Sequence, residues 1–415
     1  MSKKIFLRYC VIGIFCIIVS GMISMLSTLN PWSVHMPDVD SAVWLSRGIA
    51  MKQGAIMYVD VWDHKGPILF VIQYLGLSAT PHSFVGIWIL EWVANCLTVF
   101  LLYKIARIVG ANTAVALSSA FMCMVLLYGF YSGGNCVEMW ALPFINMGLY
   151  IFVKYFMTEK IVSWEIIVLG ICAVYTFLLN GNLISIWMAY IPIVFMLLIY
   201  QKQWKELKVC VISFLSGILI AVLPVAITLL VQGSMISFIE IYFGFNTTYT
   251  NGVTLMSFYS SIMKFAYFND YFVWVHIICV IYWIVKEKGR LGLTLYSLWF
   301  TAIALLMLSM SGRGYDHYGI QLVPCMIIPA TICLKTGFIW CQNNKNFMVA
   351  AVIIFLFWGR FEVEDMITDI QWTMDTSVNN YGACGQYEDY ETINNWTGRF
   401  TEEELKTKVF VYREG

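Results

Sequence analysis

The sequence predicts an all-α polytopic membrane protein, a transmembrane helix bundle that crosses a bilayer about eleven times. Apolar residues make up 60% of the 415 residues and charged residues only 12%, whereas a soluble domain carries about 25% charged residues. Mean hydropathy is +0.75, and stretches long enough to span a membrane recur along the chain. The formal net charge of zero excludes a basic nucleic-acid-binding surface.

The topology follows from the apolar stretches and from the basic residues between them. Lysine and arginine gather in the N-terminal flank and in alternate loops, which the positive-inside rule assigns to the cytoplasm. An odd number of spans then places the C-terminus on the extracytoplasmic side of the membrane. The candidate spans are 6–28, 83–103, 111–130, 139–157, 164–180, 183–200, 208–231, 270–285, 291–310, 318–334 and 347–359.

We expect residues 1–360 to form one transmembrane module and residues 361–415 a short extracytoplasmic tail. The two long outer loops are 29–82 and 232–269. In the first, residues 41–54 and 66–77 are too short or too polar to span, and their helical periodicity predicts helices that lie at the interface. Loops of this length are usually functional.

The first outer loop concentrates ionisable residues in a chain that has few of them. One interpretation is that this loop is polar simply because it is wet. However, the charged residues of this loop are interspersed with tryptophans and a tyrosine. A loop that is only a solvated spacer would not need such aromatic side chains. The aromatic residues are Trp32, Trp44, Tyr58 and Trp62, and the ionisable ones are Asp38, Asp40, Asp60, Asp63, His64 and Lys65.

These residue types fit a site for a phosphorylated ligand beside an acidic catalyst. A carboxylate at the water interface can accept a proton from an attacking hydroxyl, and acids can also hold a divalent cation. His64 and Lys65 offer hydrogen-bond donors and positive charge to phosphate. Gly66 and Pro67 turn the chain directly afterwards.

A second group of candidate residues follows the ninth span on the same predicted face. Arg313, Tyr315, Asp316 and His317 lie in the segment 311–324. They fit either an interfacial aromatic belt with a snorkelling arginine or a phosphate clamp. The glycines that flank Arg313 favour the clamp, because small neighbours let a guanidinium approach an anion closely.

A third segment, 131–144, presents Asn135 and Glu138 at the outer mouth of the fourth span. Glu138 fits equally an acid favoured by the helix dipole and a sugar-binding or second acidic residue. Glu91 lies inside the second span, where a charge is costly. It is expected either to face a wet cavity or to be a protonated interior acid.

Together these elements resemble the bacterial branch of the GT-C glycosyltransferases, relatives of protein O-mannosyltransferases and lipid A aminoarabinose transferases. The resemblance rests on an Asp after the first span and on three ordered elements across residues 30–330. They are Gly54, Tyr58, Asp60 and Asp63 to Pro67; then Asn135, Glu138, Leu142 and Pro143; then Arg313 to Tyr318. Similar proteins usually continue into a longer outer portion, so we expect a shortened tail here.

The resemblance implies transfer of a sugar from a polyprenyl-phosphate donor to an acceptor hydroxyl of a lipid, glycan or protein at the outer membrane face. Asp40 is similar to the family's catalytic base, with Asp38 as a competitor, and His64, Lys65, Arg313 and His317 to donor-phosphate contacts. Asp60, Asp63, Asn135, Glu138 and Tyr315 are expected to bind substrate. The sequence contains no nucleotide-binding glycine motif and no His/Cys ligand spacing, and whether a divalent cation assists is left open.

Two other functions fit a multi-span chain. A secondary transporter would place its ionisable groups near the bilayer midplane in broken helices, whereas here they gather at one interface. A non-catalytic lipid-binding membrane protein is the other alternative, and the short tail favours it.

Overall fold

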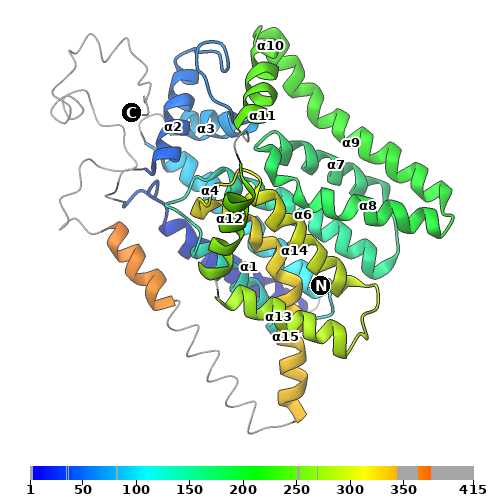
Figure 1. The fold of residues 1–415 in the computed structure, drawn as a ribbon. Coiled ribbons are helices and arrows are strands. Elements are labelled where there is room, and N and C mark those ends of the chain that lie inside the picture. Colours follow the sequence, from blue (N-terminus) through cyan, green and yellow to red (C-terminus); the bar gives the residue numbers. More distant parts are fainter. Residues whose placement is uncertain are drawn as a thin grey trace.

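The computed structural model describes residues 3–33, 35, 37–80, 83–249, 253–268, 270–343 and 363–374. Within these ranges every regular element is a helix, and the pairing of Met57 with Val61 is an isolated bridge. The predicted all-α class is therefore confirmed. Figure 1 shows the helices stacked into one bundle, with several short helices gathered at one end.

Each of the first ten candidate spans corresponds to a helix. The helices are α1 (Lys3–Met25), α4 (Val85–Ile108), α5 (Thr113–Tyr128), α6 (Val137–Thr158), α7 (Ser163–Phe177), α8 (Ser185–Tyr200), α9 (Trp204–Val231), α13 (Asp270–Val285), α14 (Leu293–Ser309) and α15 (Val323–Asn343). The eleventh candidate, 347–359, lies outside the described residues.

Five helical stretches in the described part of the chain are long and apolar enough to cross a membrane: Phe6–Met25, Val85–Ile108, Val137–Thr158, Trp204–Val231 and Asp316–Trp340. The helices α5, α7, α8, α13 and α14 are equally apolar but have only 15 to 17 residues. A helical membrane protein is thus supported, while eleven crossings and their orientation stay predictions.

Short helices cover one end of the bundle, which we call the outer end after the predicted topology. The first outer loop contains α2 (Val39–Lys52) and α3 (Pro67–Ala79), close to the two interfacial helices expected from the sequence. α3 begins at a proline, which suits the first helical position because its missing N–H needs no partner there. The other outer elements are α10 (Met235–Phe238), the π-helix η2 (Ile239–Phe245), α11 (Asn246–Tyr249), α12 (Leu255–Phe268) and the 3₁₀ segment η3 (Asp316–Leu322). A short 3₁₀ turn, η1 (Gly181–Leu183), joins α7 to α8.

Buried polar contacts join α1 to α4 inside the bundle. Asn95 Nδ2 donates to Ser24 Oγ at 3.1 Å, and Ser27 Oγ donates to the Glu91 carboxylate at 2.8 Å. Glu91 is fully buried and also accepts from the Tyr131 hydroxyl. The expected interior acid is therefore stabilised by hydrogen bonds from the turns that follow α1 and α5, which satisfy a group that would otherwise be costly to bury.

The helix at 363–373 packs against the outer end. Trp372 stacks on His35 with ring centroids 3.7 Å apart, and its carbonyl oxygen lies 2.8 Å from His35 Nε2. The Tyr128 hydroxyl, at the end of α5, donates to Asp369 at 2.7 Å. This helix therefore lies at the same end of the bundle as His35 of the first outer loop.

The topology gives a labelling prediction. A cysteine at Gln371 should react with a membrane-impermeant maleimide in intact cells, whereas one at Lys288, between α13 and α14, should react only after permeabilisation. Both side chains are exposed, so accessibility reports the side of the membrane. The parent protein gives the native-cysteine background, and labelling of both positions from the same side would contradict the topology.

Candidate functional site

The loop between α2 and α3 is built by its own side chains. The backbone N–H of Ile56 donates to the Asp60 carboxylate at 2.7 Å, and Tyr58, at φ +71°, donates its N–H to the carbonyl of Val61 at 2.9 Å. The Tyr58 hydroxyl reaches the carbonyl of Lys65 at 2.8 Å. Asp60 therefore stabilises the turn, and its predicted contact with substrate stays a prediction.

Two contacts attach this loop to distant helices. Gly66 donates its N–H to the carbonyl of Leu179 at 3.2 Å, and a side chain at position 66 would overlap the carbonyl of Leu178. Asn246, just after the π-helix, donates from Nδ2 to the carbonyl of His64 at 3.0 Å. Only glycine allows the first approach, so the loop has a fixed position beside α7 and η2.

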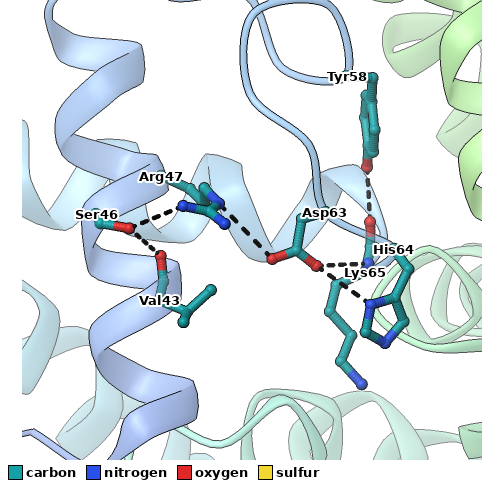
Figure 2. Close-up of polar contacts among 7 residues, drawn as sticks. All are labelled: Val43, Ser46, Arg47, Tyr58, Asp63, His64 and Lys65. Carbon is teal, nitrogen blue, oxygen red and sulfur yellow. Dashed lines mark hydrogen bonds and ion pairs between the residues drawn. The ribbon is translucent and has the colours of Figure 1, made fainter. Parts of the chain in front are cut away.

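Asp63 is the buried centre of the loop (Figure 2). Its Oδ1 accepts the backbone N–H of Lys65 at 3.0 Å and lies 3.8 Å from His64 Nδ1, while its Oδ2 lies 4.0 Å from Arg47 Nε. Burial raises the pKa of Asp63, and the amide and charge of Lys65 together with Arg47 oppose that shift. Asp63 thus orders cationic side chains around it.

His64 is neutral at physiological pH. Burial, together with the nearby charges of Lys65 and Arg313, lowers its pKa to about 3. The ring lies 5.4 Å from that of Phe245 and 6.1 Å from that of Trp62. His64 can therefore hydrogen-bond to an anion, while the positive charge expected at this site comes from Lys65 and the arginines.

The second predicted segment meets the first. His317 Nε2, in η3, lies 3.8 Å from Asp40 Oδ2, in the first turn of α2. The Asp40 side chain is 51% exposed, so this carboxylate remains open to solvent and to a ligand. His317 stacks on Tyr315 with ring centroids 5.8 Å apart. Asp38 occupies the position before α2 and makes no capping hydrogen bond there.

Helix α12 holds the loop that carries Arg313. Lys264 Nζ forms an ion pair with Asp316 at 2.7 Å and also donates to the carbonyl of Gly314. Ser261 Oγ donates to the carbonyl of Arg313 at 3.3 Å, and Arg313 Nη1 lies 3.3 Å from the Tyr315 hydroxyl. Four side-chain contacts thus fix this loop close enough to His64 for the Arg313 charge to act on it.

The third predicted segment lies deeper. Asn135 is fully buried, and its amide bonds to protein groups on several helices. Glu138, in the first turn of α6, is 2% exposed, and its Oε2 has no hydrogen-bond partner among the described residues. The substrate contacts predicted for both residues remain untested.

Arg47 is a site residue that our sequence reading missed. Its side chain is 12% exposed, its Nη1 donates to Ser46 Oγ at 3.2 Å, and its Nε makes no hydrogen bond within the described structure. A guanidinium has five N–H donors, so most remain available. Arg47 follows Asp40 by seven residues, two helical turns, and that spacing could have revealed their shared face.

The cations and acids come together without a metal-ligand geometry. Among the described residues, no group of three or more histidine, cysteine, aspartate or glutamate side chains could hold a metal ion. The arrangement provides the half-exposed carboxylate of Asp40, the neutral imidazole of His64 and three cationic side chains. Such a site can bind a phosphate group next to a general base.

Residues 2–336 match the family model described as "Putative competence-induced protein Ccs4 N-terminal domain". The chain belongs to this family. The matched region contains all three segments discussed above, and the family description names no reaction. No curated protein matches the chain. These findings neither favour nor oppose the resemblance to GT-C glycosyltransferases.

The neutral state of His64 predicts a pH effect on stability. The unfolded chain binds a proton at His64 below pH 6.5 and the folded chain only near pH 3, so stability should fall as pH falls through this window, by at most about 1.4 kcal/mol per pH unit. Thermal unfolding of the purified protein at pH 6.5 and pH 4.5 measures this loss, which His64→Gln should reduce.

Asp63→Asn is the control for this measurement. Asp63 has a raised pKa, so it favours the folded state as pH falls, opposite to His64. Its replacement should therefore steepen the loss of stability. An identical pH dependence in the parent and in His64→Gln would contradict a depressed His64 pKa.

Proposed function

We propose that this protein transfers a sugar from a polyprenyl-phosphate donor to an acceptor hydroxyl at the outer membrane face. The observation that carries this proposal is the 3.8 Å approach of His317 to Asp40. It joins the exposed carboxylate of α2 to the loop of Arg313, beside Lys65 and His64. A base and an anion-binding group are the two components that such a transfer requires.

The proposed reaction is an inverting displacement. Asp40 accepts the proton of the acceptor hydroxyl, whose oxygen attacks the anomeric carbon of the sugar. The bond from that carbon to the phosphate oxygen breaks, and the electron pair leaves with the lipid phosphate. Lys65, Arg313 and Arg47 stabilise the departing charge, and His317 orients the base; Asp38 is the alternative base.

An apolar cavity beside the loop suits the lipid chain. It has a volume of about 450 Å³ and lies between α7, α8, α9 and η2. Leu178, whose carbonyl abuts Gly66, and Phe243 of the π-helix belong to its wall. An isoprenoid chain in this cavity would place its phosphate near Lys65, with apolar side chains replacing lipid around it.

Asp40→Asn tests the base directly. The amide keeps the size of the side chain but cannot take up the proton, so turnover should fall by about 10²-fold or more. The measurement is sugar transfer from a polyprenyl-phosphate-sugar donor to an acceptor in proteoliposomes. Donors with different sugars need to be screened first with the parent protein.

Glu240→Gln is the matched control, because Glu240 is an exposed acid on the outer π-helix and has no part in the proposed reaction. Its turnover should equal that of the parent. Full turnover in Asp40→Asn would remove Asp40 as the base and direct attention to Asp38. Absence of transfer with every donor would end the proposal itself.

Arg47→Gln tests the anion-binding group. Loss of a charged hydrogen-bond donor to phosphate should raise the KM for the donor by about tenfold, with a smaller fall in kcat. Arg47→Lys should recover part of this loss because it restores charge without the planar fork. Unchanged kinetics in both variants would place Arg47 outside the donor site.

The same preparations distinguish the alternatives. A secondary transporter would move a labelled solute across the proteoliposome membrane without forming a new glycosidic bond. A non-catalytic lipid-binding protein would bind polyprenyl phosphate, with binding weakened in Arg47→Gln, and release no product. The description of the family as competence-induced gives no chemical reason to prefer either.

A further inference from the structure

The side-chain amide of Asn135 is the centre of a buried hydrogen-bond network. Its Oδ1 accepts from Gln73 Nε2 at 2.8 Å and from Trp140 Nε1 at 2.9 Å. Its Nδ2 donates to Ser41 Oγ at 2.9 Å and to Gln73 Oε1 at 3.3 Å. An asparagine amide offers two donors and two acceptor positions, so all four are used within the protein.

This network joins helices that are distant in sequence. Ser41 lies in α2, Gln73 in α3 and Trp140 in α6, and the backbone N–H of Asn135 is 3.4 Å from the Glu91 carboxylate in α4. All of these groups except the Trp140 indole come from residues that are at most 1% exposed. In such surroundings hydrogen bonds have little competition from water, so each has a strong preference for one geometry.

The network reaches the candidate site through Ser41. This residue directly follows Asp40 in the first turn of α2, and within the described structure its hydroxyl is the side-chain group of α2 to which the Asn135 amide hydrogen-bonds. A second contact lies seven residues, about two turns, farther along. There the backbone of Gly48 approaches α3 so closely that an added Cβ would lie 2.8 Å from Gln73 Cβ.

We infer that Asn135 is a positioning residue, which fixes the rotation and depth of α2 and thereby the place of Asp40 opposite His317. This inference rests on the proposed function, because it gives Asn135 a role in that reaction. Gln73 is its partner: its side-chain amide pairs with Asn135, and its Cβ meets Gly48. Asn135 thus acts through α2 without touching substrate.

The positive backbone angle of Asn135 supports this role. Its φ is +52°, in the left-handed region that asparagine tolerates better than most residues. The residue therefore ends the turn after α5 and directs its amide towards α2 and α3 at the same time. Aspartate at this position would keep the acceptor oxygen but lose both donors, including the one to Ser41.

Hydrogen–deuterium exchange of the full-length protein in nanodiscs tests the inference without reference to activity. In Asn135→Ala, the backbone amides of residues 39–48 should exchange at least about tenfold faster, while those of α9 and α15 stay within about twofold of the parent. Ser41→Ala removes only the α2 contact and should produce a smaller change in the same peptide. This variant also answers the question if Asn135→Ala fails to fold.

Asn146→Ala is the matched control. Asn146 is a fully buried asparagine in α6 whose Nδ2 donates to Leu142 in its own helix, so its loss should leave residues 39–48 unchanged. Faster exchange in every helix of Asn135→Ala, or none in residues 39–48 of either Asn135→Ala or Ser41→Ala, would overturn the inference.

Kinetics separate this inference from the proposed function. If transfer occurs, Asn135→Ala should lower kcat by about tenfold and leave the donor KM within about twofold, and Gln73→Ala should add little to it because both act on one helix. If the parent transfers no sugar but the exchange of α2 changes as expected, the proposed reaction fails and the fixing of α2 stands. A parent that transfers sugar, with exchange unchanged, sinks the inference alone.

Discussion

The hydrogen bonds around the Glu91 carboxylate hold the outer end of the bundle together. Ser27 in the turn after α1 and Tyr131 in the turn after α5 both donate to this buried acid, and the backbone of Asn135 lies beside it. A carboxylate in an apolar interior must have such partners, because water cannot supply them. The turn between α5 and α6, which donates hydrogen bonds to Glu91, therefore also positions the Asn135 side-chain amide that bonds to Ser41 of α2.

The candidate site is assembled from segments that lie far apart in the sequence. Loop 57–66 is fixed by Gly66 against the end of α7 and by Asn246 after the π-helix. The loop of Arg313 is fixed by Lys264 and Ser261 of α12. Since the two loops are attached to different helices, the separation of Asp40 from His317 depends on the packing of the whole outer end.

Much of this fold could be predicted from the sequence. Long apolar stretches predicted ten helices that the structure contains, and the periodicity of 41–54 and 66–77 predicted the two helices of the first outer loop. Hydropathy is a local property, so it could locate elements. The five apolar helices of 15 to 17 residues were less certain, because length alone does not settle whether they span the membrane.

The site could be predicted only in part. Residue type and clustering indicated Asp40, Lys65 and Arg313 as candidates. They could not indicate the contacts that decide the charge and the burial of the residues around them. The neutral charge of His64 depends on its burial and on a cation far away in sequence, and the burial of Asn135 depends on four helices. Arg47 stands outside the charged run 60–65, and only its seven-residue spacing from Asp40 indicates that the two side chains share a face of α2.

The contact between Gly66 and the carbonyl of Leu178 has a mechanical consequence. Leu178 is at once a wall of the apolar cavity and a neighbour of the loop that carries Lys65. Because no side chain separates the backbones of Gly66 and Leu178, a movement of one backbone displaces the other. A ligand that moves α7 away from α9 would therefore also shift Lys65. Binding in the apolar cavity would in this way change the position of a charged side chain in the candidate site.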